Sequence, residues 1–184
     1  SPFHAKKELV SKYETKPSGR LHKDVTMATM IQAVDDGVGQ LRATLDELET
    51  LTGSQVAFYH FVEPDQVTLS FQAWSTNTAE RMCSAEVPGR HYPVAHAGIW
   101  ADCISQRRPV VHNDRASLPS RKAFPKGHVP VTRELVVPVM RGSGIVAILG
   151  VGNKATDYTE HDVRTVASLA DLAWDIVESK RAQE

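Results

Sequence analysis

The first candidates for chemistry in this sequence are its two cysteines, Cys83 and Cys103. They form no CxxC or CxxCH motif, and two cysteines are too few for a disulfide framework. Cys103 lies three residues after Trp100 in WADCISQRRPVVHND, a stretch that predicts a short amphipathic helix, a stop at Pro109 and a strand. This spacing puts Cys103 and Trp100 on one helix face, where a buried thiol mostly acts as a small apolar group. A redox role stays open, because one cysteine could attack and the other resolve.

Charge and composition exclude some classes of function. The formal net charge is −1, whereas a nucleic-acid-binding surface needs clustered Lys and Arg in excess. No apolar run approaches the roughly 18 to 20 residues that span a bilayer, and SPFHAKKELV has no signal-peptide core. The eight histidines are scattered, with no HExxH motif, so we expect no structural zinc site. We therefore expect a cytoplasmic chain with no nucleic-acid partner and no membrane contact of its own.

These candidate residues need elements to position them. Residues 1–23 are polar and turn-prone, which predicts an arm or linker, and residues 24–184 are long enough for one domain. A long helix is predicted to end at Gly53, because apolar residues recur in steps of four and three, as in a coiled-coil seam. These residues are Met27, Ile31, Val34, Val38, Leu41, Leu45 and Leu48.

Strands and a second long helix follow. Residues 55–62 and 66–74 predict one hairpin, and residues 134–140 and 145–151 predict another. Between the hairpins we expect a short helix at 77–85, a loop at 87–93 and a basic loop at 115–133. The closing helix runs from Thr159 to about Arg181, and Thr159 with Asp162 resembles a capping box. Adjacent hairpins and separate helices predict an α+β fold with an antiparallel sheet.

Several segments together resemble a GAF domain over about residues 35–180. They are GIW at 98–100, RRPVVHND, LVVPV, the run GIVAILGVGNK, and Tyr158 with Asp162. Residues 125–139 together with GIW resemble the subgroup of GAF domains found in bacterial and archaeal sensor histidine kinases and cyclic-di-GMP enzymes. The resemblance implies the GAF fold: a central antiparallel sheet of about five or six strands, with the terminal helices on one face and a ligand pocket on the other. It also implies a non-enzymatic sensor of a two-component or similar system, whose effector domain lies outside this chain.

Three ligand chemistries known in GAF domains can be compared with the residues. Asn153, Lys154, Tyr158 and Asp162 resemble the cyclic-nucleotide NKFDE motif, but Val163 replaces its last Glu, so strand-end and helix caps are the better interpretation. Bilin attachment uses a Cys followed by His, a pair that is absent here. Haem remains a weak alternative and the cofactor is otherwise unknown. His128 would be its axial ligand and Cys83 a thioether partner, unless His128 is a polar lid residue.

We expect the pocket to lie between the sheet and residues 74–133, since small-molecule sites have mostly apolar walls and a few convergent polar groups. The predicted ligand-binding residues are Trp74, Tyr92, Trp100 and Cys103 as walls, and Asn113, Asp114, His128 and Arg133 as polar contacts. The basic loop 115–133 contains no acidic residue, which favours an anionic ligand; a solvated loop is the alternative. No catalytic residue and no metal site are predicted.

Two further functions stay open, and one assembly is predicted. The chain could be a GAF-fold free methionine-(R)-sulfoxide reductase that uses pocket cysteines, or a ligand-free dimerisation spacer whose pocket is filled by its own side chains. In the closing helix, Val163, Val166, Ala170, Ala173 and Val177 repeat the rhythm of the first helix. We therefore expect a parallel homodimer through the terminal helices, whose shifts would carry a pocket event to the effector domain.

Overall fold

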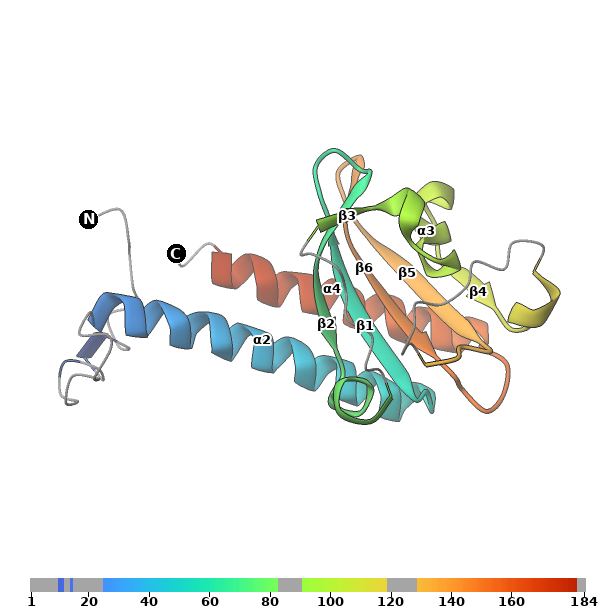
Figure 1. Cartoon of the computed structure of the whole chain (residues 1–184), viewed down its shortest axis with the longest axis horizontal. Coiled ribbons are helices and arrows are strands. Elements are labelled where there is room, and N and C mark those ends of the chain that lie inside the picture. The colour runs from blue at the N-terminus through green and yellow to red at the C-terminus, as the bar shows by residue number, and fades with distance from the viewer. Residues whose placement is uncertain (1–9, 12–13, 15–24, 83–90, 119–128, 182–184) are drawn as a thin grey trace.

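The computed structural model describes residues 10–11, 14, 25–82, 91–118 and 129–181. Figure 1 shows the elements, which in chain order are α2 (Val25–Thr52), β1 (Val56–Val62), β2 (Thr68–Trp74), η1 (Thr78–Met82), β3 (His91–Pro93), η2 (Val94–His96), η3 (Ile99–Ala101), α3 (Asp102–Gln106), β4 (Val110–His112), η4 (Arg115–Ser117), β5 (Glu134–Arg141), β6 (Gly144–Gly152) and α4 (Glu160–Arg181). Among the described residues, no helix combines the length and the apolar character needed to span a bilayer.

The strands form one six-stranded sheet in the order β3-β2-β1-β6-β5-β4, and every neighbouring pair is antiparallel. This confirms the predicted α+β architecture and both hairpins. One strand of the six was not predicted. It is β3, which lies in the segment 87–93 predicted as a loop, so that prediction is wrong for His91–Pro93. A proline is tolerated there because β3 is an edge strand that pairs on one side with Thr68–Ser70 of β2.

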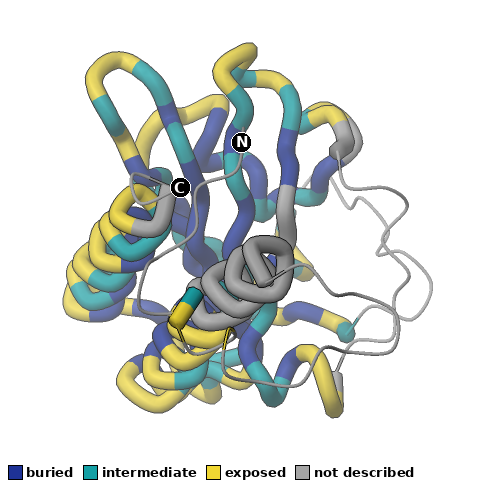
Figure 2. The backbone as a smooth tube through the Cα atoms, turned by 90° about the vertical axis from the view of Figure 1, so that its left-hand side faces the viewer, coloured by how far each residue is buried: buried dark blue, intermediate teal, exposed yellow. Residues whose placement is uncertain are grey.

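The two long helices cover one face of the sheet. Successive side chains of a strand point to opposite faces, so the odd-numbered positions of β5, such as Leu135 and Val137, meet the helices while Val136 faces away. The tube in Figure 2 shows the same division along α4, whose inward side is buried and whose outward side is exposed. This packing leaves the opposite face of the sheet to the short helices and the loops.

The apolar residues at heptad spacing in α2 and α4 pack differently from the prediction. Leu41, Leu45 and Leu48 are 2%, 0% and 0% exposed, and they pack in the same cluster as Ala170 and Ala173 of α4. A residue buried against its own sheet cannot also fill a partner helix, so the seam predicted through these positions is wrong for this stretch. The step of 3.5 residues did not separate the two interpretations, because Leu41 to Leu48 cover one heptad, over which a 3.5 and a 3.6 repeat differ by only about 20°.

The long helices bring the two ends of the described domain together. α2 ends at Gly53, whose φ of +66° is the left-handed conformation expected of the predicted stop. In Figure 1, α2 runs toward the sheet and α4 runs back beside it, so their outer ends lie on the same side of the molecule. The first half of α2 extends beyond the sheet.

Candidate functional site

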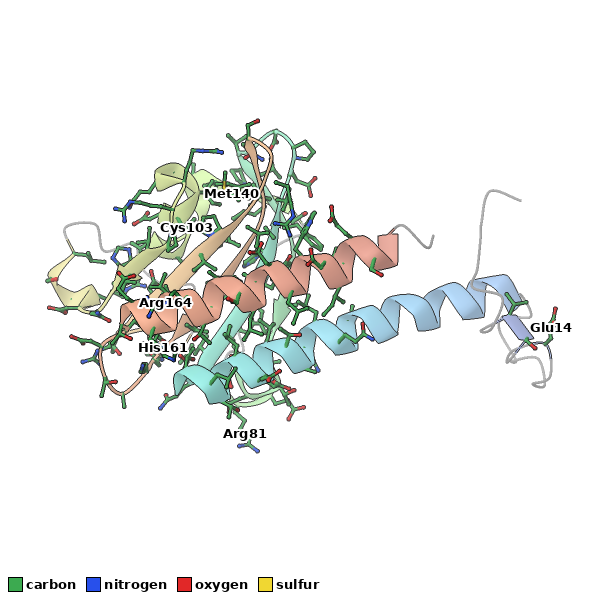
Figure 3. All side chains as sticks on the ribbon, turned by 180° about the vertical axis from the view of Figure 1, so that it is seen from behind. Glu14, Arg81, Cys103, Met140, His161 and Arg164 are labelled. Carbon is green, nitrogen blue, oxygen red and sulfur yellow. The ribbon has the colours of Figure 1, made fainter. Side chains whose placement is uncertain are left out.

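The second face of the sheet carries a separate apolar cluster covered by short helices. Cys103 and Ile104 of α3 pack there against Val136 of β5 and Ile148 of β6. Cys103, which Figure 3 labels, is 0% exposed. Burial, with the nearby carboxylates of Asp102 and Glu134, raises the pKa of its thiol. Cys103 is therefore buried in this apolar cluster, on the helix face that the sequence pattern predicted, and its thiol is held in the unreactive protonated form.

Aromatic rings form the part of this face over β1 and β6. The Trp100 ring stacks on the His60 ring, with centroids 4.9 Å apart and planes 12° apart. Phe58 meets Trp100 edge to face at 5.6 Å. A side chain at Gly150 would overlap the Phe58 ring, so this position needs glycine for space. Trp100 thus has two aromatic neighbours, Phe58 and His60, that sequence analysis did not single out.

Glu134 is the outstanding polar residue of this face. It opens β5 opposite His112 of β4 and Gly152 of β6, and residues paired across an antiparallel sheet point to the same side. Its side chain therefore faces α3 together with Val136. The residue is 3% exposed, and its Oε1 has no hydrogen-bond partner among the described residues. A buried polar atom without a partner is rare in folded proteins and marks a site that needs explanation.

Charged groups surround this carboxyl. Burial raises the pKa of Glu134 to about 7; the Arg115 guanidinium acts in the opposite direction, and the Asp102 carboxylate adds to the rise. Burial also lowers the pKa of Arg115, while Glu134 raises it. His112 Nε2 lies 3.4 Å from Asp102 Oδ2. We call Asp102, His112, Arg115 and Glu134 the Glu134 cluster; it comes from four different elements, α3, β4, η4 and β5.

The predicted polar contacts are placed differently. Asn113 follows β4, and both its amide atoms bond the backbone of Tyr158: Oδ1 accepts from the N–H at 2.7 Å, and Nδ2 donates to the carbonyl at 3.1 Å. Asp114 accepts from the Ala116 N–H and so caps η4. Arg133 Nε donates to Asp157 at 3.1 Å. These three side chains all have partners within the fold.

The other predicted site residues divide between the second face and the undescribed parts. Trp74 ends β2 opposite Phe58, which puts it on the face of the aromatic rings. Tyr92 pairs with Leu69 in β3, but its side chain lies outside the described part of the structure. His128 and Cys83, the candidate haem ligands, also lie outside the described residues. Within the described part, no three His, Cys, Asp or Glu side chains gather as metal ligands would.

The segment that resembles a cyclic-nucleotide motif is a structural joint. Lys154 Nζ lies 2.8 Å from both oxygens of Asp162, which also accepts from the Thr159 N–H and hydroxyl. Burial opposes ionisation of Asp162, but the hydrogen bonds from Lys154 and Thr159 prevail and its pKa is lowered. Asn153 adopts φ +60° and bonds the backbone of Thr132 and Pro130. The predicted strand-end cap and capping box are confirmed.

Sequence analysis missed Glu134 and the part played by its neighbours. The available signal was a single acidic residue at the start of an otherwise apolar run, ELVVPV, in phase with the inward Val136. Alternation alone would have put Glu134 on the pocket face. It did not reveal that the carboxyl is fully buried, since that depends on segments distant in sequence.

Comparisons with known proteins agree with this architecture. A curated relative, the methyl sulfide methyltransferase-associated sensor of Methanosarcina acetivorans, is 38% identical over 140 residues, covering 76% of this chain and 14% of the relative. The chain therefore spans a small part of that relative's length. The GAF domain of a Coxiella burnetii phosphoenolpyruvate-protein phosphotransferase superposes with TM-score 0.64 at 12% identity, covering 96% of this chain and 92% of that one.

Enzymes share the fold too. A type II free methionine-R-sulfoxide reductase from Thermoplasma acidophilum superposes with TM-score 0.59 at 16% identity, covering 80% of this chain and 96% of that one. At such identities the likeness concerns the fold alone. The family model described as GAF domain matches residues 40–178. This match covers the second half of α2, all six strands and most of α4, and the chain belongs to the GAF domain family.

Proposed function

We propose that this chain is a cytoplasmic sensor module that binds a small molecule on the α3 face of its sheet. Residues 24–184 form the sensor domain, residues 1–23 serve as a linker, and the two long helices relay the bound state to an effector domain outside this chain. The effector would be of the sensor-kinase or cyclic-di-GMP type. The carrying observation is the hydrogen-bonded joint between the second face and both long helices.

The joint begins next to the Glu134 cluster. Asn113 directly follows His112 of that cluster and holds the backbone of Tyr158 by two hydrogen bonds. Tyr158 precedes α4 by two residues, and its hydroxyl is 2.8 Å from Ser54 Oγ. Ser54 in turn accepts from Thr52, the last residue of α2, at 2.7 Å. A displacement of the β4–η4 segment on ligand binding is thereby coupled to the start of α4 and the end of α2.

A homodimer remains part of the proposal, with a relocated seam. The heptad positions Met27, Ile31 and Val34 precede the part of α2 that packs on the sheet, and Leu172 on α4 is 50% exposed. We therefore propose that the partner helices meet along the outer half of α2. Replacing Met27 and Ile31 by Glu should convert a dimer into a monomer in light scattering, whereas Leu41→Glu should unfold the domain. A monomeric wild type at high micromolar concentration would contradict the dimer.

The environment of Cys103 speaks against the reductase alternative. A reductase needs a thiolate, and burial raises the pKa of this thiol. We therefore propose a non-enzymatic module. Reduction of free methionine sulfoxide by the purified chain with an external thiol, lost in Cys103→Ser, would overturn this.

The relay can be tested by hydrogen exchange. Asn113→Ala should raise amide exchange at Tyr158 and in the first turn of α4, and then in the last turn of α2, because it removes both bonds to Tyr158. Gln66→Ala is the control, because the Gln66 amide bonds Glu63 and Ile145 at the hairpin end of the sheet, away from Tyr158 and Ser54. Exchange changes confined to β4 in Asn113→Ala would contradict the relay.

Ligand occupancy needs a separate measurement. Native mass spectrometry and an absorption spectrum of the chain as purified would reveal a retained metabolite or a chromophore, including haem. A thermal-shift screen of small metabolites follows. If no compound is retained or stabilises the chain, the spacer alternative replaces the sensor.

A further inference from the structure

We propose that the Glu134 cluster recognises a protonated amine of the ligand, with Glu134 Oε1 as the acceptor of its N–H groups. This inference rests on the proposed function, because it names the chemical class of ligand for the same face. It differs from the sequence prediction of an anionic ligand, which rested on a basic loop whose Arg121, Lys122 and Lys126 lie outside the described residues.

The first argument is hydrogen-bond satisfaction. Leaving a buried acceptor without a donor is destabilising, and more so for a charged group. Oε1 of Glu134 is such an acceptor, and a ligand N–H would supply the donor that the described residues do not. Hydrogen bonds to ionised acceptors are also the stronger class.

The second argument is the local charge. Two carboxylates, Glu134 and Asp102, belong to the cluster, while Arg115 is its one guanidinium and His112 already lies 3.4 Å from Asp102. A ligand anion placed at Oε1 would meet the carboxylates first. A ligand cation at Oε1 would offset the negative charge of the two carboxylates.

The third argument is the surface next to Glu134. Its neighbour across β6 is Gly152, beside which the Val131 side chain lies, and Gly150 follows on the same face under the Phe58 ring. Phe58 and Trp100 lie edge to face, so π-faces belong to the same side of the sheet. Aromatic faces attract cations through the ring quadrupole. The face therefore combines an acceptor, negative charge and aromatic rings, the chemistry that selects an ammonium group.

The test uses three probes of one shape: benzylammonium, benzyl alcohol and benzoate. Ethylammonium adds a small probe. Binding to the whole chain is measured by calorimetry or ligand-observed NMR at about pH 8, where the Glu134 carboxyl with a pKa near 7 is ionised. We expect benzylammonium to bind about tenfold more tightly than benzyl alcohol, and benzoate to bind most weakly.

Variants identify the acceptor. Glu134→Gln should weaken benzylammonium binding about tenfold and leave benzyl alcohol unchanged. Glu134→Asp, which keeps the charge on a shorter side chain, should show an intermediate loss, and Glu178→Gln on exposed α4 should show none. Circular dichroism verifies folding of each variant. Equal binding in Glu134→Gln, preference for benzoate, or no binding of either ammonium probe at millimolar concentration would overturn the proposal.

The outcomes separate this inference from the sensor function. If benzoate or benzyl alcohol binds instead and changes amide exchange at Tyr158, the sensor stands and the amine assignment fails. If benzylammonium binds through Glu134 without any exchange change in α4, the site stands and the relay fails.

Discussion

The buried carboxyl of Glu134 makes the stability of this domain depend on pH in a specific direction. Its pKa is raised from 4.5 to about 7 in the folded chain, so the folded state binds this proton more tightly than the unfolded state. The stabilisation is complete below about pH 4.5 and is lost as the pH rises through about 7. Glu134→Gln cannot ionise and removes this dependence.

The magnitude follows from the pKa values. One pKa unit corresponds to about 1.36 kcal/mol, so the free energy of unfolding of wild type should fall by about 2 to 3 kcal/mol relative to Glu134→Gln between about pH 5 and pH 8. Other carboxylates and histidines titrate in both proteins and cancel in the comparison. The neutral acid and the amide are nearly isosteric, so the two proteins should be close in stability at about pH 5.

The assay is urea unfolding followed by circular dichroism at both pH values and one protein concentration. Glu178→Gln serves as the control, because it removes an exposed carboxylate of α4 and should parallel wild type. A difference between wild type and Glu134→Gln that stays constant within about 0.5 kcal/mol across the pH range would refute the reasoning. It would mean that the carboxyl is hydrated or paired in solution.

Three other predictions concern single residues. Gly150→Ala should destabilise the fold by about 1 to 3 kcal/mol in the same urea assay, because its Cβ overlaps the Phe58 ring, and Phe58→Leu should recover part of that loss. Cys103 should stay unmodified by iodoacetamide in the native chain and react after unfolding, as peptide mass spectrometry can show; rapid native labelling would contradict its burial. Asp162→Asn should cost about 1 to 2 kcal/mol near pH 7, since the lowered pKa of Asp162 means that the ionised form stabilises the fold above its usual pKa and that this contribution is lost as the pH falls. Equal stability of Asp162→Asn and wild type near neutral pH would show that the capping box and the ion pair to Lys154 contribute nothing net.

The sequence predicted most of the fold because its signals are local. Runs rich in β-branched and aromatic residues on either side of the turn sequences EPD and RGSG placed the hairpins, and a glycine able to adopt positive φ ended α2 at Gly53. The capping box of Thr159 and Asp162 correctly predicted the start of α4. Strand β3 was missed because it has only three residues, too few to show an apolar periodicity, and a proline and a glycine lie just before it. Only its pairing with β2 defines it as a strand.

Sequence analysis predicted part of the packing on the second face. Helical spacing was enough to put Trp100 and Cys103 on one buried face. It was not enough for the polar residues: Asn113 looked like a ligand contact, and the structure uses both ends of its amide to hold Tyr158, 45 residues away. Glu134 passed unnoticed because the cost of burying a carboxyl arises from what lies around it, and Asp102, His112 and Arg115 reach it from three separate elements.

The sequence by itself determined the long helices, the antiparallel hairpins, the caps and the family, since each depends on neighbouring residues. The tertiary structure alone decided which surface each apolar stripe covers. Leu41, Leu45 and Leu48 had the spacing of an interhelical seam, yet they lie against their own sheet. The hydrophobic effect is non-directional. An apolar stripe on a helix therefore predicts that the stripe is buried, but it does not predict which surface buries it. The same reason holds for Glu134, whose buried oxygen, without a partner among the residues that the structure describes, exists only after the strands are paired and the short helices are in place.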